Sequence, residues 1–204
     1  MTRLRQVYSA LLLLVVGLQG CGNNPLLRTA SADYEPIRVG SQWTYTSPSG
    51  GPGLTRQVTA AGLQQGRDAF TVSQTIGGVP STEFWSLRSG ALEIYSVSLG
   101  AWTLARRLPY VPGNKWDLAT GSVLSSSIQT VEALESLDVP AGKFPGCYRL
   151  KTRTNTYNPG SGLTSTAETI VWSAPDVGDV RYASVDTSGT VNITLELSSY
   201  RIPR

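Results

Sequence analysis

The chain has 204 residues, of which 40% are hydrophobic, and it carries 17 basic against 14 acidic side chains. It contains no histidine, which is the usual general base near neutral pH and the commonest metal ligand in proteins. This composition excludes a Ser-His-Asp triad, a Cys-His dyad and nearly all zinc hydrolase sites. The length is sufficient for a single domain with a substantial hydrophobic core.

The N-terminus has the pattern of an export signal. Arg3 and Arg5 precede an apolar run over residues 10–18, which is too short for the roughly 20 residues of a membrane span. The following Leu18-Gln19-Gly20-Cys21 resembles a bacterial lipobox. The resemblance implies signal cleavage between Gly20 and Cys21, diacylation of the Cys21 sulfur and acylation of its amine. An ordinary secretory signal and an uncut membrane anchor are the alternatives.

We divide the chain into three predicted parts. Residues 1–20 are the lipoprotein signal peptide, residues 21–33 the lipidated cysteine with a flexible tether, and residues 34–204 a β-rich domain. Cleavage removes Arg3 and Arg5, so that 15 basic side chains remain against 14 acidic ones. Because the mature protein is nearly neutral, we expect no nucleic-acid partner.

From residue 34 onward, the sequence is typical of an all-β domain. Short runs rich in Val, Ile, Thr, Tyr and Trp alternate with clusters of Gly, Pro, Asn and Ser. Residues 191–198 alternate apolar and polar side chains, which is the period of a strand with one buried face. The pattern predicts strands over residues 42–47, 54–61, 67–76, 81–88, 91–98, 101–107, 123–138, 145–157, 163–173, 178–187 and 190–201.

The short connections between these runs predict how the strands pair. Successive strands are expected to be antiparallel neighbours, because parallel pairing needs a crossover of about a dozen residues or more. So many strands must curl, since a flat open sheet exposes its edges. We predict a single antiparallel meander that forms a curved, partly closed barrel or half-barrel, with a two-sheet β-sandwich as the alternative. Residues 129–137 are rich in helix formers, but their β-leaning neighbours favour a long strand.

Basic residues gather at two places in the predicted domain. Arg106 and Arg107 are adjacent, and Arg149, Lys151 and Arg153 follow one another at a period of two. That period predicts that the three side chains share one face of a strand. A solvated sheet face is favoured there over a site for a lipid headgroup or a polysaccharide.

Other candidate chemistry is sparse. Cys147 lies in a strand-like run and is interpreted as a small buried hydrophobic residue rather than as a reactive thiol. Two acidic pairs, Asp176 with Asp179 and Glu132 with Glu135, have the composition that a glycosidase needs. We expect both pairs to be solvated surface, and we expect the protein not to be an enzyme.

Two segments of the sequence are similar to each other. Gly40-Ser41-Gln42-Trp43, followed by Tyr45, and Gly113-Asn114-Lys115-Trp116 each place a glycine turn before an aromatic residue at a strand start. A tryptophan at such a position buries a large apolar area at the end of a core. The similarity is consistent with two related halves, and aromatic binding platforms are the functional alternative.

These segments belong to a longer series of motifs. Val139-Pro140-Ala141-Gly142-Lys143-Phe144, the stretch from Val171 to Val180 and the closing Leu195 to Tyr200 follow them in order. The series, over residues 36–201, resembles a broad group of uncharacterised bacterial envelope lipoproteins with the patterns G-x-x-W-x-Y, V-P-A-G-x-F and W-x-A-P-x-V-G-x-V. The resemblance implies an open β-barrel at the envelope and implies no catalytic residue.

Two functions are compatible with these observations. The first is a membrane-anchored module that binds an apolar or amphipathic envelope ligand inside the curved sheet, suggested by Trp43, Trp85, Trp102, Trp116 and Trp172. The second is a structural or assembly factor that binds an envelope protein at the membrane surface. No cofactor and no metal is expected, and the ligand-binding residues are not predicted. Gly22 after the cysteine favours the outer membrane over the inner one, by resemblance to lipoprotein sorting rules.

Overall fold

The computed structural model describes residues 33–204, and this part of the chain consists of β-strands without helices. The predicted signal peptide, the cleavage site between Gly20 and Cys21 and the lipidation of Cys21 lie outside the described residues. No helix in the described part has the length and apolar character to cross a membrane. The strands are β1 (Gln42–Thr46), β2 (Leu54–Gln64), β3 (Arg67–Ile76), β4 (Val79–Arg88), β5 (Ala91–Ser96), β6 (Ala101–Arg107), β7 (Lys115–Leu118), β8 (Ser125–Val139), β9 (Gly142–Asn158), β10 (Leu163–Ala174), β11 (Gly178–Val185) and β12 (Val191–Arg201).

Every strand that the sequence predicts is present, and one further strand is not predicted. The missed strand is β7, which has four residues and alternates the buried Trp116 with exposed neighbours. A run of this length is too short to show a period. Residues 129–137 lie within β8, so the prediction of a long strand there is confirmed.

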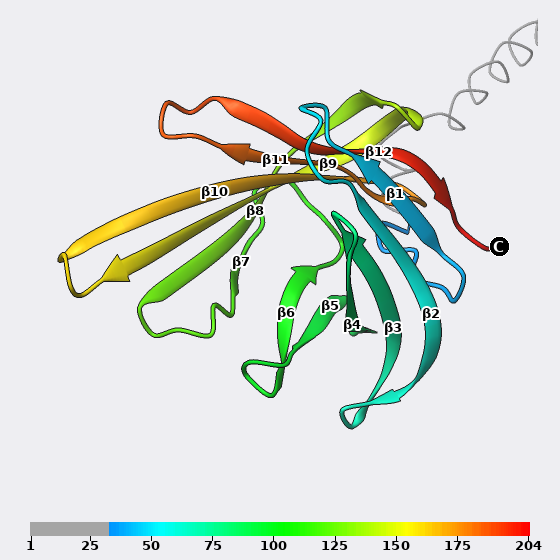
Figure 1. Cartoon of the computed structure of the whole chain (residues 1–204), viewed down its shortest axis with the longest axis horizontal. Helices are drawn as coiled ribbons and strands as arrows, with labels where there is room; N and C mark the ends of the chain where they lie inside the picture. Colours follow the sequence, from blue (N-terminus) through cyan, green and yellow to red (C-terminus); the bar gives the residue numbers. More distant parts are fainter. Residues whose placement is uncertain (1–32) are drawn as a thin grey trace, which may run out of the picture.

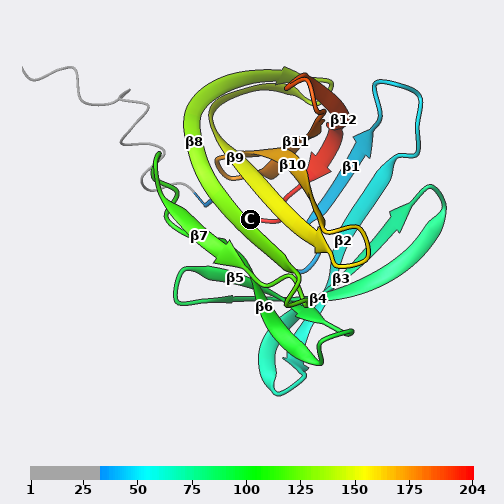
Figure 2. The ribbon, with the colours of Figure 1, turned by 90° about the vertical axis from the view of Figure 1, so that its left-hand side faces the viewer.

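All the strands form one antiparallel sheet that curls into a nearly closed barrel (Figures 1 and 2). Successive strands pair along β1–β6 and along β7–β12, and the first strand, β1, pairs with the last, β12. No ladder joins β6 to β7, which leaves one seam unsealed. The predicted antiparallel meander with partial closure is therefore confirmed, and the two-sheet sandwich is excluded.

The two halves of the sheet begin with the same local geometry. Gly40 has a φ of 91° and its N–H donates to the carbonyl of Val58, while Gly113 has a φ of 92° and donates to the carbonyl of Val131. Gly113 follows Gly40 by 73 positions, and Val131 follows Val58 by the same interval. Each glycine lies shortly before a strand whose second residue is a buried tryptophan. The similarity seen in the sequence therefore reflects equivalent positions in two six-strand halves of the sheet.

The longest hairpin, β8–β9, bends back toward β12 (Figure 2). Its turn is Pro140-Ala141, and the Ala141 N–H donates to the carbonyl of Leu197 in β12 at 2.9 Å. Gly142 after the turn has a φ of 134°, which a side chain with a Cβ rarely adopts. The V-P-A-G-x-F motif is thus a tight turn, and its hydrogen bond joins the end of the hairpin to β12.

Two buried apolar clusters lie in the barrel. The larger one includes Trp43, Val58, Trp85 and Trp172, and Cys147 belongs to it with no exposed surface. Burial raises the pKa of the Cys147 thiol to about 12, which confirms its interpretation as a buried hydrophobic residue. The smaller cluster contains six buried residues near the seam: Tyr34, Tyr110, Trp116, Val131, Tyr148 and Leu150.

Candidate ligand-binding cavity

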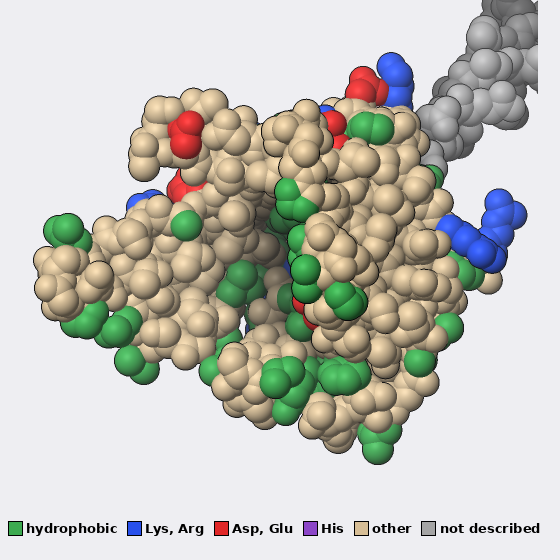
Figure 3. All heavy atoms as spheres, in the orientation of Figure 1, with side chains coloured by type: hydrophobic (Ala, Val, Ile, Leu, Met, Phe, Trp, Pro, Cys, Tyr) green, Lys and Arg blue, Asp and Glu red, His purple; other side chains and the backbone are tan. Residues whose placement is uncertain are grey.

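A cavity of about 170 Å³ lies inside the barrel, between β1–β6 and the start of β11. Figure 3 shows the corresponding face hollowed near its centre, with hydrophobic side chains around the hollow. One part of the wall is apolar and the other part is charged or phenolic. The lining residues that the argument below uses are Trp85, Leu92, Ile94 and Ala105 on the apolar side, and Glu35, Arg56, Arg106, Asp179 and Tyr182 on the polar side.

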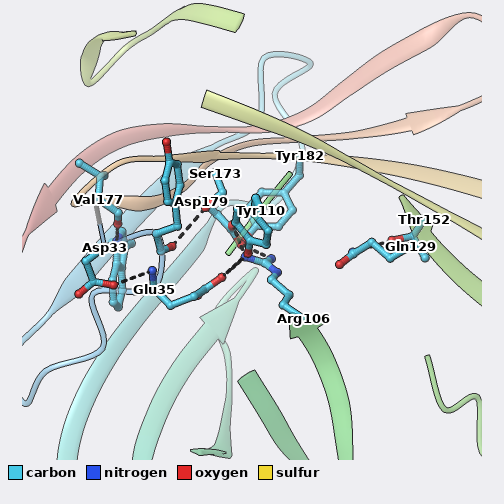
Figure 4. Close-up of polar contacts among 12 residues, drawn as sticks. Asp33, Glu35, Arg106, Tyr110, Gln129, Thr152, Ser173, Val177, Asp179 and Tyr182 are labelled. Atoms are coloured by element: carbon cyan, nitrogen blue, oxygen red, sulfur yellow. Dashed lines mark hydrogen bonds and ion pairs between the residues drawn. The ribbon is translucent and has the colours of Figure 1, made fainter. Parts of the chain in front are cut away.

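The polar side is built around the Arg106 guanidinium (Figure 4). Its Nη1 and Nη2 atoms donate to the two Asp179 oxygens at 2.6 and 2.7 Å, and Nη1 also donates to Glu35 Oε1 at 2.8 Å. The Tyr110 hydroxyl donates to the same Glu35 oxygen at 2.8 Å, and the Tyr182 hydroxyl donates to Asp179 Oδ2 at 2.6 Å. Arg106 is therefore paired with two carboxylates in a network that is almost fully buried.

An irregularity in β11 places two of these groups on the same face of the sheet. Trp172 pairs with Arg181 and the next residue of β10, Ser173, pairs with Asp179, so that Val180 is an extra residue in β11. Side chains alternate between faces along a regular strand, and a bulge interrupts this alternation. Asp179 and Tyr182, three positions apart, can thus both face the cavity and bond to each other.

The segment before β1 supplies the third member of the network. Asp33 and Tyr34 are held by the β10–β11 turn, since the Asp176 N–H donates to the Asp33 carbonyl and the Ser173 hydroxyl donates to the Tyr34 carbonyl. Glu35 is 5% exposed and points toward Arg106 (Figure 4). The chain that enters the barrel from the predicted tether therefore forms part of the cavity wall.

The two carboxyl groups of the network have opposite pKa shifts. Burial raises the pKa of Glu35, the nearby Asp179 charge adds to this, and Arg106 offsets only part of it. Burial also opposes ionisation of Asp179, but the Arg106 guanidinium outweighs it and lowers the pKa of Asp179. Burial raises the pKa of Tyr182 to about 12, so its hydroxyl keeps its proton. The centre of the network is therefore the Arg106–Asp179 ion pair, to which the Tyr182 hydroxyl donates.

Arg56 of β2 is the second guanidinium in the cavity wall, and its partners are neutral. Its Nη1 donates to the Tyr182 hydroxyl at 3.2 Å and its Nη2 to Gln74 Oε1 at 3.4 Å. Its carbon Cζ lies 4.9 Å from the centre of the Trp85 ring. The Arg56 Nε is buried and has no hydrogen-bond partner.

The members of the two acidic pairs considered in the sequence have different partners in the structure. Asp176 lies in the β10–β11 turn and accepts from the Asp33 N–H, whereas Asp179 faces Arg106 in the cavity. Glu132 forms an ion pair with Arg149 at 3.1 Å, and Glu135 accepts from the Trp172 indole. The expectation that both pairs are solvated surface is wrong for Asp179, because the bulge in β11 turns it inward.

The basic residues of β9 share one face, as the sequence predicts. Lys151 and Arg153 both approach Glu168 of β10, and Arg149 pairs with Glu132. These partners support the structural interpretation of that face. The two adjacent arginines of β6 differ in environment. Arg107 is exposed, whereas Arg106 is the centre of the cavity network.

Only two of the five tryptophans line the cavity. Trp43 and Trp85 do so, and their indoles donate to the Val177 carbonyl and to Glu83. Trp102 packs under the Arg67 guanidinium, and Trp116 belongs to the second apolar cluster. Fewer tryptophans therefore line the cavity than the sequence suggests.

Sequence reasoning missed Glu35, Arg56 and Tyr110 altogether. No local motif marks them, and the only signal was the density of basic residues at Arg106. Among residues 33–204, no group of three His, Cys, Asp or Glu side chains is placed to hold a metal ion.

No family model matches the chain, and no curated protein matches its sequence. Two solved structures share the fold over 83% of this chain and 99% of their own. A presumed lipoprotein of Parabacteroides distasonis has a TM-score of 0.56 at 15% identity. A presumed exported protein with a YmcC-like fold, from Bacteroides fragilis, has a TM-score of 0.57 at 16% identity. The similarity defines the fold, which in this chain is a nearly closed antiparallel barrel.

Proposed function

We propose that the protein is a lipid-anchored, non-catalytic module of the bacterial cell envelope, and that its barrel cavity holds a small amphipathic molecule. The cavity carries this proposal, because an apolar wall faces a small set of polar groups across one partly open space. Small-molecule sites commonly have this composition. The apolar wall would accept the hydrocarbon part of the ligand and the guanidinium side its polar part.

Two observations support the proposed location in the cell envelope. Leu18-Gln19-Gly20-Cys21 has the pattern of a lipobox, and the two proteins with the same fold are described as a lipoprotein and an exported protein. We infer that the mature protein is acylated at Cys21 and attached to a membrane facing the periplasm. Gly22 favours the outer membrane.

Native mass spectrometry of the mature protein, released directly from its own membrane, tests the binding function. We expect a small molecule bound in a one-to-one ratio, which solvent extraction would then recover. Ala105→Leu in β6 places a larger side chain in the cavity and should abolish the extra mass. Ala101→Leu is the matched control, because Ala101 is exposed on the same strand and does not line the cavity. A clean mass for the unaltered protein contradicts the proposal.

The unsealed seam favours a second candidate function, an assembly factor that binds an envelope protein. β6 and β7 each have one edge without a strand partner, and such an edge can pair with an extended segment of another chain. A clean mass together with specific cross-links from β6 or β7 to a protein partner would establish this function instead.

A further inference from the structure

We propose that the ligand carries an acidic head group, a carboxylate or a phosphate ester, and that Arg56 is the residue that binds it. This inference rests on the proposed binding function and names the chemistry of the ligand. It follows from a difference between the two arginines of the cavity wall, Arg56 and Arg106.

Arg106 has no capacity for a further anion. Two carboxylates, Glu35 and Asp179, accept from its Nη atoms at distances between 2.6 and 2.8 Å. The Arg106 charge is therefore compensated within the protein. An anion added beside it would meet the negative charge of Asp179 and would be repelled.

Arg56 has the opposite character. Within the described chain no carboxylate lies within 4.0 Å of its nitrogens, and its two hydrogen bonds, to Tyr182 and Gln74, are long and lead to neutral groups. Arg56 is only partly exposed, and no carboxylate contacts its guanidinium directly, since Asp179 is reached through the Tyr182 hydroxyl. Charge-assisted hydrogen bonds to an anion are stronger than such neutral ones. An acid that displaced these two contacts would gain a charged partner for Arg56.

Arg56 lines the cavity and has one donor without a hydrogen-bond partner. Its Nε is buried and unpartnered, and a planar guanidinium presents Nε and a neighbouring Nη as a parallel pair of donors. A carboxylate or phosphate accepts from such a pair with two oxygens. Two acidic side chains of the lining lie near this part of the cavity, and both are already engaged. Gln74 and Trp85 donate to the two oxygens of Glu83 at 2.8 and 2.7 Å. Asp179 is bound by Arg106 and is linked to Arg56 only through the Tyr182 hydroxyl.

The apolar wall of the cavity begins beside the Arg56 guanidinium. The Arg56 guanidinium lies over the Trp85 ring, and Trp85 pairs with Ile94 across the β4–β5 ladder. Leu92 and Ala105 extend this surface within the cavity. An acid bound at Arg56 would thus have its hydrocarbon part against Trp85 and Ile94, which is the arrangement that an amphipathic acid requires.

Arg67, in contrast to Arg56, has a carboxylate in direct contact with its guanidinium. It also lies over a tryptophan, Trp102, at 5.4 Å, but its Nη1 is 2.5 Å from Glu93 Oε2. Arg67 does not line the cavity. It is therefore the matched control for a substitution of Arg56.

The test compares three eight-carbon probes by calorimetric titration of the mature protein in lipid nanodiscs at pH 7, with empty nanodiscs as the blank. The probes are octanoate, octanol and octylamine. We expect octanoate to bind at least about tenfold more tightly than octanol, from one charge-assisted bidentate contact. Arg56→Gln should reduce octanoate binding to the level of octanol, and Arg67→Gln should leave the preference unchanged.

The outcomes separate this inference from the proposed function. Equal binding of octanoate and octanol, or a preference for octylamine, would overturn the acidic head group while leaving the cavity function intact. Failure of all three probes to bind would overturn both proposals. The comparison of probes on the unaltered protein needs no variant, so it holds even where Arg56→Gln impairs folding.

Discussion

The residue on which the cavity most depends is Asp179. It accepts two hydrogen bonds from Arg106 and one from Tyr182, and its side chain is only 7% exposed. Removing the Asp179 charge leaves the buried Arg106 with Glu35 alone, whose ionisation burial disfavours, and breaking a buried ion pair costs about 3 kcal/mol or more. We therefore expect Asp179→Asn to lower the free energy of unfolding by about 3 kcal/mol, measured by urea denaturation.

Asp138 provides the matched control for this change. It pairs with Lys143 at 3.7 Å, and both side chains are mostly exposed. Exposed pairs of this kind contribute less than about 1 kcal/mol, so Asp138→Asn should have little effect. Equal losses in the two variants would show that the Arg106 network does not stabilise the fold.

The raised pKa of Glu35 predicts a pH dependence of a definite sign. Burial disfavours the ionised form in the folded protein, so ionisation of Glu35 favours unfolding. The stability linked to the protonated carboxyl is complete below its unfolded pKa, about 4.5, and is lost as pH rises through the higher folded pKa. Relative to Glu35→Gln, the wild-type protein should lose stability as pH rises above 4.5 and should level off once Glu35 is ionised. Unfolding curves of both proteins at a series of pH values measure this, and a constant difference would contradict it.

Among the elements, the β10–β11 turn positions the cavity residue Asp179. Gly178 precedes it with a φ of 90°, whereas Gly62 in β2 has an ordinary strand conformation and open space around its Cα. A Cβ at Gly178 would meet only ordinary contacts, the nearest being Pro36 at 3.6 Å, so its cost is conformational. We expect Gly178→Ala to destabilise the protein by roughly 1–2 kcal/mol and Gly62→Ala to be neutral or stabilising. Thermal unfolding of the two variants distinguishes them, and equal midpoints would exclude this role for the turn.

The same element explains how much could be predicted from the sequence. The strands on both sides of the β10–β11 turn could be predicted, because alternation of apolar and polar side chains is a local signal. The cavity network was not found, because Glu35, Arg106 and Asp179 come from three distant segments. Asp179 faces the cavity only because β11 has one residue more than β10 at the bulge. No local pattern in the sequence predicts that bulge.

At the scale of the whole molecule, the cavity and the predicted anchor are close in sequence. Glu35 lines the cavity and follows the predicted lipidated Cys21 by 14 positions. Without the predicted signal peptide the chain would carry 15 basic against 14 acidic side chains, so its electrostatic attraction to an anionic membrane would be weak. Membrane attachment should therefore depend on the acyl chains, and two chains suffice where one is marginal.

Replacing the predicted lipidation site tests this dependence. Cys21→Ser removes the sulfur to which the lipid would be attached, and we expect the protein to leave the membrane fraction or to accumulate as the uncut precursor. Cys147→Ser is the matched control, since Cys147 is a free, buried thiol within the barrel and should not affect attachment. Fractionation followed by intact-mass measurement separates release from failed processing. If Cys21→Ser fractionates with the membrane at the mature mass, an acyl anchor at Cys21 is wrong, and the barrel must be held at the envelope by a partner instead.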